Sequence, residues 1–224
     1  MDILSLLCIV SVTLTGLTKG VDVLPDGPLN RAVGGTVIFN TTLTPPEKPF
    51  LAVAWSVIIN NTERFIITSG SSNNTGPEYE GRITLYRSTG SLELRDVTLN
   101  DSGKYRFNII PDGGNLITGS TELKIFERIS SVNITSTDQT IEGNSVNLTC
   151  DGAGADFTRE WMKDGSSLTL VVNMTLYDEN RVLSFLSLKK TDSGEYLCNI
   201  SNPVSFDEAK YSMVVNLATT PVKH

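Results

Sequence analysis

Two stretches of this sequence are near copies of each other: DSGKYRF at residues 101–107 and DSGEYLC at residues 192–198. Apolar residues alternate before each copy, in residues 92–97 and 183–188, and every matched position lies 91 residues apart. Alternation, a turn through Asp-Ser-Gly and renewed alternation from the Tyr predict two β-strands joined by a tight corner. A pattern that returns in one register predicts two copies of the same folding unit.

The residues upstream of each copy repeat too, because alternating strands are predicted at residues 34–41 and 143–150, and a tryptophan follows each. The order Cys150, Trp161, Cys198 is that of an immunoglobulin sandwich, in which the tryptophan packs on a disulfide between the two sheets. A tyrosine two residues before the second cysteine is also typical of that fold. We therefore predict an all-β chain of two tandem immunoglobulin-like β-sandwiches. The predicted core positions are Trp55, Tyr105, Phe107, Trp161 and Tyr196.

The distance from the tryptophan to the second bridge position separates the two domains into types. It is 52 residues from Trp55 to Phe107 but only 37 from Trp161 to Cys198. The 15 extra residues of the first domain are enough for the two added strands of a variable-type domain, whereas the second is predicted to be a shorter intermediate or constant-like domain. The predicted boundaries are 1–20 for a signal peptide, 21–127 for domain one, 128–217 for domain two and 218–224 for a tail.

Only the second domain keeps a cysteine pair. Cys8 falls in the predicted signal peptide, so Cys150 and Cys198 are predicted to form the only disulfide of the mature chain in an oxidising compartment. In the first domain Thr41 and Phe107 occupy the two bridge positions. We expect burial of the larger Phe107 side chain to fill the space between the sheets and to offset part of the missing bridge.

A charged pair is predicted at the base of the first sandwich. Arg82 and Asp101 stand where variable-type domains place a salt bridge, although two solvated charges are the alternative. In the second domain Asp192 repeats the aspartate, but the position nineteen residues before it is Asn173 rather than an arginine. The sequence therefore predicts the ion pair in domain one only.

The two ends of the chain indicate export. Residues 3–12 are almost unbroken apolar sequence, too short to span a bilayer, and small residues at 18 and 20 suit cleavage after Gly20. This is typical of a secretory signal peptide, and a buried N-terminal strand is the alternative. No other stretch reaches eighteen consecutive apolar residues. We expect an extracellular chain that carries no membrane anchor as given, either secreted or the ectodomain of a longer anchored form at the external side of the plasma membrane.

Composition and motifs argue against several classes of function. The formal net charge of -7 disfavours binding to nucleic acid, because phosphate backbones repel an acidic chain. The single histidine, His224, lies in the predicted tail, and no Gly-x-Ser-x-Gly or phosphate-cradling motif occurs. Two mature cysteines cannot build a structural zinc site. We therefore expect no enzyme, no cofactor, no metal and no small-molecule substrate. A glycan-binding sandwich is a weaker alternative, for which Tyr86 or Phe126 would be the exposed aromatic residues.

The chain is rich in acceptor sequences for N-linked glycans, as expected of a secreted surface glycoprotein. In domain one, none of them falls within the strands predicted around Trp55, around Tyr105 and after Gly114. Since a bulky sugar blocks a protein interface, the sheet that these strands form is the predicted contact surface. The predicted acceptors are Asn40, Asn60, Asn73, Asn100, Asn133, Asn147, Asn173 and Asn199.

The missing first bridge, together with GPEYEGR at 76–82, NDSGKY at 100–105 and NPVS at 202–205, resembles the carcinoembryonic antigen-related cell adhesion molecules over residues 21–217. Hepatocyte cell adhesion molecule is a similar alternative. The resemblance implies adhesion through the sheet of strands lettered G, F, C and C′ in domain one. Its face positions fall on Ser56, Asn108, Ile110 and Leu116. Ser56 departs from the family's large aromatic residue, which puts homophilic pairing in doubt.

We predict from these observations a cell adhesion or recognition protein that binds another cell-surface protein, homophilically or heterophilically. A secreted decoy or immune-modulatory ligand, which would use the same surface, is the alternative. Outward positions on the bare sheet combine apolar and polar residues, as protein interfaces do. The predicted partner-binding positions are Ala54, Ser56, Ile58, Arg106, Asn108, Ile110, Leu116 and Ile117.

Overall fold

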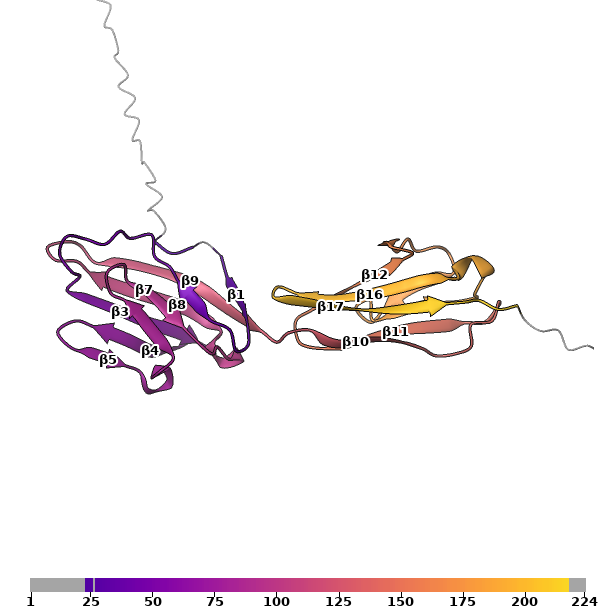
Figure 1. Cartoon of the computed structure of the whole chain (residues 1–224), viewed down its shortest axis with the longest axis horizontal. Helices are drawn as coiled ribbons and strands as arrows, with labels where there is room; N and C mark the ends of the chain where they lie inside the picture. Colours follow the sequence, from indigo (N-terminus) through magenta and orange to yellow (C-terminus); the bar gives the residue numbers. More distant parts are fainter. Residues whose placement is uncertain (1–22, 26, 218–224) are drawn as a thin grey trace, which may run out of the picture.

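A computed structural model describes residues 23–25 and 27–217 of the 224-residue chain. The predicted signal peptide with Cys8 and the predicted tail therefore lie outside the described residues. The described chain forms two all-β domains that follow each other end to end (Figure 1), as the internal repeat predicts.

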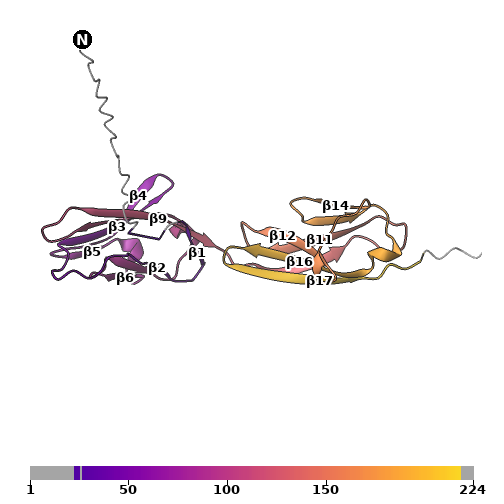
Figure 2. The same cartoon turned by 90° about the horizontal axis from the view of Figure 1, so that it is seen from above.

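Domain one is a sandwich of a large and a small sheet. Its large sheet pairs β1 with β9 in parallel, and its other strands pair antiparallel. Figure 2 shows β3 and β9 on one side of the domain and β2 and β6 on the other. The large sheet has the order β1 (Leu29–Ala32), β9 (Ile117–Phe126), β8 (Gly103–Ile110), β3 (Ala52–Ile59), β4 (Thr62–Ser69), β5 (Asn73–Thr75). The small sheet has the order β2 (Val37–Phe39), β7 (Ser91–Leu94), β6 (Ile83–Tyr86).

The strands β4 and β5 are the C′ and C″ strands that the spacing after Trp55 predicts. In the same lettering β3 is strand C, β8 is strand F and β9 is strand G. Asn60 and Asn61 form the two-residue turn from β3 to β4, with φ angles of 49° and 61°. Asparagine tolerates this left-handed conformation better than most residues, and such turns match the twist of paired strands.

Domain two has two sheets of four strands each. One sheet has the order β10 (Ser130–Ser136), β11 (Val146–Ala153), β15 (Val182–Phe185), β14 (Met174–Tyr177). The other has the order β13 (Ser166–Ser167), β12 (Thr158–Lys163), β16 (Gly194–Asn202), β17 (Ser205–Met213). Only the two-residue strand β13 lies between β12, which contains Trp161, and β14. Domain one has two strands, β4 and β5, in the equivalent place, so domain two is of the shorter type that its tryptophan spacing predicts.

The corner that the repeat predicts is built in the same way in both domains. Short 3-10 turns, η2 (Leu99–Asp101) and η3 (Lys190–Asp192), precede β8 and β16. The Tyr105 hydroxyl donates a hydrogen bond to the Asp101 carbonyl oxygen at 2.8 Å, and the Tyr196 hydroxyl donates to the Asp192 carbonyl oxygen at 2.8 Å. Burial raises the pKa of both phenols, so each remains a protonated donor at neutral pH.

Aromatic rings fill the centre of domain one in place of a disulfide. The Trp55 ring lies 5.5 Å from the Phe39 ring and 5.4 Å from the Phe107 ring, measured between centroids, and all three side chains are buried. A Cβ atom at Gly119 would collide with the ring of Phe107, so glycine at this position makes room for the ring. In domain two Cys150 and Cys198 form the disulfide, and Trp161 is buried.

The strand predicted at residues 34–41 is shorter in the structure, where β2 ends at Phe39. The Thr41 backbone N–H donates to the Ser91 hydroxyl oxygen, and its side-chain hydroxyl donates to the Thr89 carbonyl oxygen at 2.6 Å. Thr41 is half-buried, and it is Phe39 that brings a ring from β2 onto Trp55. Side-chain hydrogen bonding thus replaces strand pairing at the bridge position.

The packing of Phe107 gives a test of domain-one stability. Phe107→Ala should lower the free energy of unfolding of domain one by about 3–5 kcal/mol, because it removes a fully buried ring and leaves a cavity. Phe65→Ala is the matched control, since the Phe65 side chain is 41% exposed and its loss should cost less than about 1 kcal/mol. Urea unfolding of the purified chain measures both, and equal losses would contradict this account of the core.

Candidate functional site

The candidate site is the outward side of the large sheet in domain one, which we call the GFCC′ face. Inward and outward positions alternate along β3, β8 and the paired part of β9, and register pairs them across strands: Arg106 lies opposite Ser56 on β3 and Ser120 on β9. The face is formed by the side chains that point away from the core: Thr118, Ser120, Glu122 and Lys124 on β9; Lys104, Arg106, Asn108 and Ile110 on β8; Ala52, Ala54, Ser56 and Ile58 on β3; Glu63, Phe65 and Thr68 on β4.

Six of the predicted partner-binding residues lie on this face. Ile110 is 44% exposed, Arg106 and Asn108 are exposed, and the three residues on β3 are partly exposed. Leu116 just precedes β9 and is 59% exposed at the end of the face. The six are Ala54, Ser56, Ile58, Arg106, Asn108 and Ile110.

Ile117 corrects the predicted set. It is paired with Ile109, whose side chain is fully buried, and it packs against the core of domain one. Directly opposite residues of an antiparallel pair share one side of the sheet, so Ile117 points inward with Ile109. Assigning it to the face was wrong because the inward–outward phase of β9 depends on its register with β8.

Sequence reasoning missed Phe65, which lies opposite Ser56 on β4 and is 41% exposed. A register shift between Trp55 and Ser56 places both Ile66 and Ile67 in the core, so alternation along β4 breaks there. The sequence signal for an outward Phe65 was its alternation with Glu63. The apolar run at residues 65–67 hides that signal, because it does not show which of its residues point outward. Phe65 adds an exposed aromatic ring beside Ser56.

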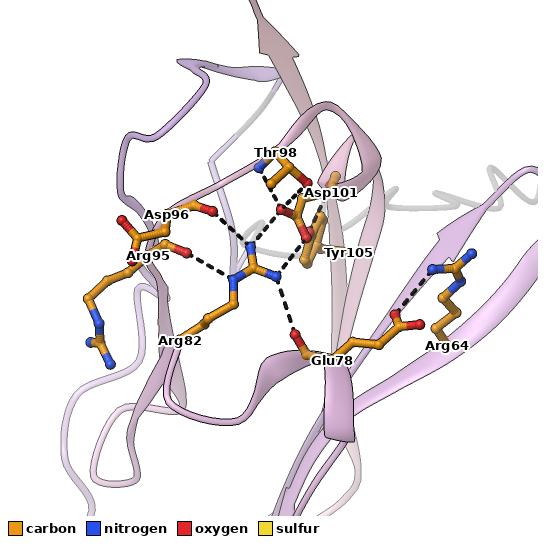
Figure 3. A network of polar contacts seen from close by, with 8 residues as sticks. All are labelled: Arg64, Glu78, Arg82, Arg95, Asp96, Thr98, Asp101 and Tyr105. Atoms are coloured by element: carbon orange, nitrogen blue, oxygen red, sulfur yellow. Dashed lines mark hydrogen bonds and ion pairs between the residues drawn. The ribbon is translucent and has the colours of Figure 1, made fainter.

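The base of domain one holds a network around Arg82, drawn in Figure 3. Its guanidinium group donates to the Asp101 carboxylate at 2.6 Å and 3.3 Å, and the Asp101 side chain is only 7% exposed. The remaining donors reach backbone carbonyl oxygens of Glu78, Arg95 and Asp96 at 3.2–3.3 Å. The hydrogen bond to Asp101 raises the pKa of Arg82. The predicted pair is thus part of a network in which the buried carboxylate also accepts the Thr98 backbone N–H at 2.7 Å.

In domain two, Asn173 takes the place of the arginine. It is buried, and its side-chain nitrogen donates to the Asp192 carboxylate at 3.0 Å and to the Ser187 carbonyl oxygen at 3.0 Å. N-linked glycans attach to this same nitrogen. Because this nitrogen donates twice in the interior, we expect Asn173 to carry no glycan and to hydrogen-bond the buried carboxylate instead.

The four glycan acceptor sequences of domain one border the GFCC′ face or lie away from it. Asn60 lies in the turn between β3 and β4, and Asn73 lies on the edge strand β5. Asn40 follows β2 in the opposite sheet, and Asn100 lies in η2 at the base. Each of these four side chains is exposed.

The acceptors of domain two are less uniform. Asn133 on β10 is exposed, whereas Asn147 on β11 and Asn199 on β16 are half-buried. Asn199 faces away from the disulfide on its strand, between the buried Cys198 and Ile200. A glycan at Asn199 would therefore project from the outer side of the sheet that contains β16.

Comparisons with known proteins agree with the fold. The Immunoglobulin V-set domain family matches residues 25–126, and the Immunoglobulin domain family Ig_3 matches residues 129–202. The chain is 31% identical over 196 residues to the mouse cell adhesion molecule CEACAM5, and the match covers 85% of this chain and 20% of that relative. The chain thus spans about a fifth of the length of the curated relative that it matches.

Solved structures show the same similarity to CEACAM proteins. Murine CEACAM1b is 28% identical, with a TM-score of 0.70, and the match covers 84% of this chain and 96% of that one. The chain is CEACAM-like in sequence and structure, and each of its two domains matches an immunoglobulin domain family. A complex of the mouse coronavirus receptor-binding domain with its murine receptor matches at a TM-score of 0.69, with 28% identity and the same coverage. The titin fragment I67-I69, at 21% identity and a TM-score of 0.56, shares the fold alone.

The matched families bear on catalysis. Immunoglobulin domains and the cell adhesion relatives are non-enzymatic, which agrees with the expectation that this chain is not an enzyme. Within residues 23–25 and 27–217, the structure contains no helix long and apolar enough to cross a membrane.

The Arg82 network of the CEACAM-like chain gives a second stability test. Arg82→Ala should lower the free energy of unfolding of domain one by about 3 kcal/mol, because it leaves the Asp101 carboxylate buried without its counter-ion. The lower end of the usual range applies, since the Arg82 side chain keeps 25% exposure. Arg64→Ala breaks the exposed pair with Glu78 and should cost about 0–1 kcal/mol. Thermal and urea unfolding measure the stability of both variants. If Arg82→Ala loses no more stability than Arg64→Ala, the network around Arg82 does not stabilise domain one.

Glycan occupancy can be read from the mass of the CEACAM-like chain secreted by mammalian cells. Thr175→Ala destroys the acceptor at Asn173 and should leave the mass of the glycoprotein unchanged apart from the substitution, because the buried amide carries no sugar. Thr42→Ala destroys the acceptor at the exposed Asn40 and should remove the mass of one glycan. A glycan lost with Thr175→Ala would contradict this expectation.

Proposed function

We propose that this chain is the extracellular recognition part of a cell-surface or secreted protein, and that it binds another cell-surface protein through the GFCC′ face of domain one. The observation that carries the proposal is a broad sheet face with several exposed apolar side chains and no glycan acceptor on its central strands. A secreted decoy or immune-modulatory ligand would use the same face and differ only in anchorage.

The exposed apolar residues support a protein partner. Phe65, Ile110 and Leu116 are 41%, 44% and 59% exposed, and the partly exposed Ile58 lies on the same face. Several apolar side chains on one sheet, among polar neighbours, are typical of a protein interface rather than of an ordinary solvated surface.

The glycan acceptors support the same face by where they lie. Asn60 is at one end of the face and Asn73 is on the edge strand β5, while Asn40 and Asn100 are elsewhere on the domain. Sugars at these positions would frame the face and leave β3, β8 and most of β9 open to a partner. In domain two an occupied Asn199 would cover the corresponding sheet, which makes that sheet a poorer contact surface.

The relatives support recognition as the class of function. One is named a cell adhesion molecule, and another is a murine receptor solved with the coronavirus receptor-binding domain. Both names describe proteins that bind proteins at the outside of cells. For the present chain we propose the same class of protein-binding function and the same extracellular location.

The GFCC′ face can be tested by placing a glycan on it. Ile110→Thr creates an Asn-x-Thr acceptor that begins at Asn108, and a sugar on this exposed asparagine should abolish partner binding or cell adhesion while the fold persists. Flow cytometry with the purified chain on cells that bind it measures the loss. The double substitution Thr84→Asn with Tyr86→Thr places a glycan on β6 in the opposite sheet and should leave binding intact. Undiminished binding with a confirmed glycan at Asn108 would locate the contact elsewhere.

A further inference from the structure

A polar hollow lies on the GFCC′ face between β8 and β9. Arg106 and Asn108 on β8 line one side, and their register partners Ser120 and Thr118 on β9 line the other. Phe107 and Gly119 complete the lining. Short side chains on β9, and the short Ser56 on the other side of Arg106, leave the guanidinium group accessible from solvent.

The side chains of this hollow are rich in hydrogen-bond donors. The Arg106 guanidinium group, the Asn108 amide and the hydroxyls of Thr118 and Ser120 all donate, and no carboxylate lines the hollow. Among the described residues Arg106 forms no ion pair, unlike Arg64, which pairs with Glu78. An accessible arginine in a hollow without negative charge is a site for a carboxylate, which a guanidinium group binds through two parallel hydrogen bonds.

We propose that this hollow receives an aspartate or glutamate side chain of a partner protein that is not a second copy of this chain. The inference rests on the proposed function, since it names the chemistry of the partner that the GFCC′ face binds. Arg106 is the residue that pairs with the incoming carboxylate, and Asn108, Thr118 and Ser120 supply further donors around it.

Symmetry disfavours a second copy as the occupant. Two identical chains that meet face to face do so across a two-fold axis, where residues near the centre meet their own copies. Arg106 lies midway along β8, with β9 on one side and β3 and β4 on the other. Central pairing would thus bring two guanidinium groups together, and like charges at an interface are costly. Both carboxylates of the face already have partners on the same chain. Glu63 accepts a hydrogen bond from the Ser56 hydroxyl at 2.7 Å, and a Glu122 carboxylate oxygen lies 3.8 Å from the Lys124 side-chain nitrogen.

The apolar surroundings favour a protein over a free anion or an acidic sugar. Phe65 and Ile110, both more than 40% exposed, and the partly exposed Ile58 lie on the strands around the hollow. Arginine beside exposed apolar side chains is the composition of the energetic centre of a protein interface. The partner should therefore present an acidic side chain among apolar ones.

The experiment measures binding of the secreted, glycosylated chain to an array of purified immunoglobulin-superfamily ectodomains that includes the chain itself. Arg106→Gln should weaken binding to the partner about 10-fold to 100-fold, because it leaves the partner's carboxylate without its counter-ion. Arg106→Lys should bind with an affinity between that of the wild type and that of Arg106→Gln, since it keeps the charge but loses the paired hydrogen bonds. Lys210→Gln is the control, because it removes one exposed positive charge from domain two and should leave binding within about 2-fold.

The dependence of binding on salt concentration distinguishes a charge interaction from shape complementarity. Raising sodium chloride from about 0.15 M to about 0.5 M should weaken binding of the wild-type chain more than that of Arg106→Gln, because the variant has lost the screened interaction. Three outcomes would each overturn the carboxylate proposal. They are binding to the chain itself and to no other ectodomain, an affinity that Arg106→Gln leaves unchanged, and binding that is abolished when sialidase removes acidic sugars from the partner. If the Ile110→Thr glycan still abolishes binding in those cases, the proposed function stands. Binding to no ectodomain, or binding that Ile110→Thr leaves intact, would overturn both.

Discussion

The contact of Trp55 with the rings of Phe39 and Phe107 holds the two sheets of domain one together where a disulfide is absent. Aromatic pairs of this kind contribute about 0.5–1.5 kcal/mol each beyond the burial of their surface. Phe107 lies on the inward side of β8, and the outward neighbours Arg106 and Asn108 belong to the GFCC′ face. The position of the face therefore depends on packing directly beneath it.

The two domains solve the same structural problem with different side chains. Both bury an aspartate at the corner before strand F, and both tie its carbonyl to a tyrosine hydroxyl. Domain one neutralises the carboxylate with Arg82, whereas domain two hydrogen-bonds it to the neutral Asn173. Domain two in turn has the Cys150–Cys198 disulfide. Domain one thus combines an ion-pair network with aromatic packing, and domain two combines a neutral hydrogen bond with a covalent link.

The proposed GFCC′ contact face joins two kinds of surface that would act differently in recognition. Phe65 and Ile110 offer apolar area, whose burial drives association without defining an orientation. The hollow beside Arg106 offers directional donors and a charge, which would define the orientation of a partner and exclude unsuitable ones. A glycan acceptor at Asn60 and another at Asn73 would limit the approach of a partner to the area between them. Affinity and selectivity would then come from adjacent but distinct residues.

The sequence by itself determined the fold, because the period-two alternation, the tryptophan spacing and the repeated Asp-Ser-Gly-x-Tyr corner are local or nearly local patterns. It also predicted the outward positions on β3 and β8 correctly, since alternation about Trp55 and Tyr105 is enough to assign them. Tertiary structure decided the rest, since register and burial arise from pairing between distant segments. Ile117 points inward in register with Ile109, Phe65 lies opposite Ser56 after a register shift, and the buried Asn173 donates a hydrogen bond to Asp192.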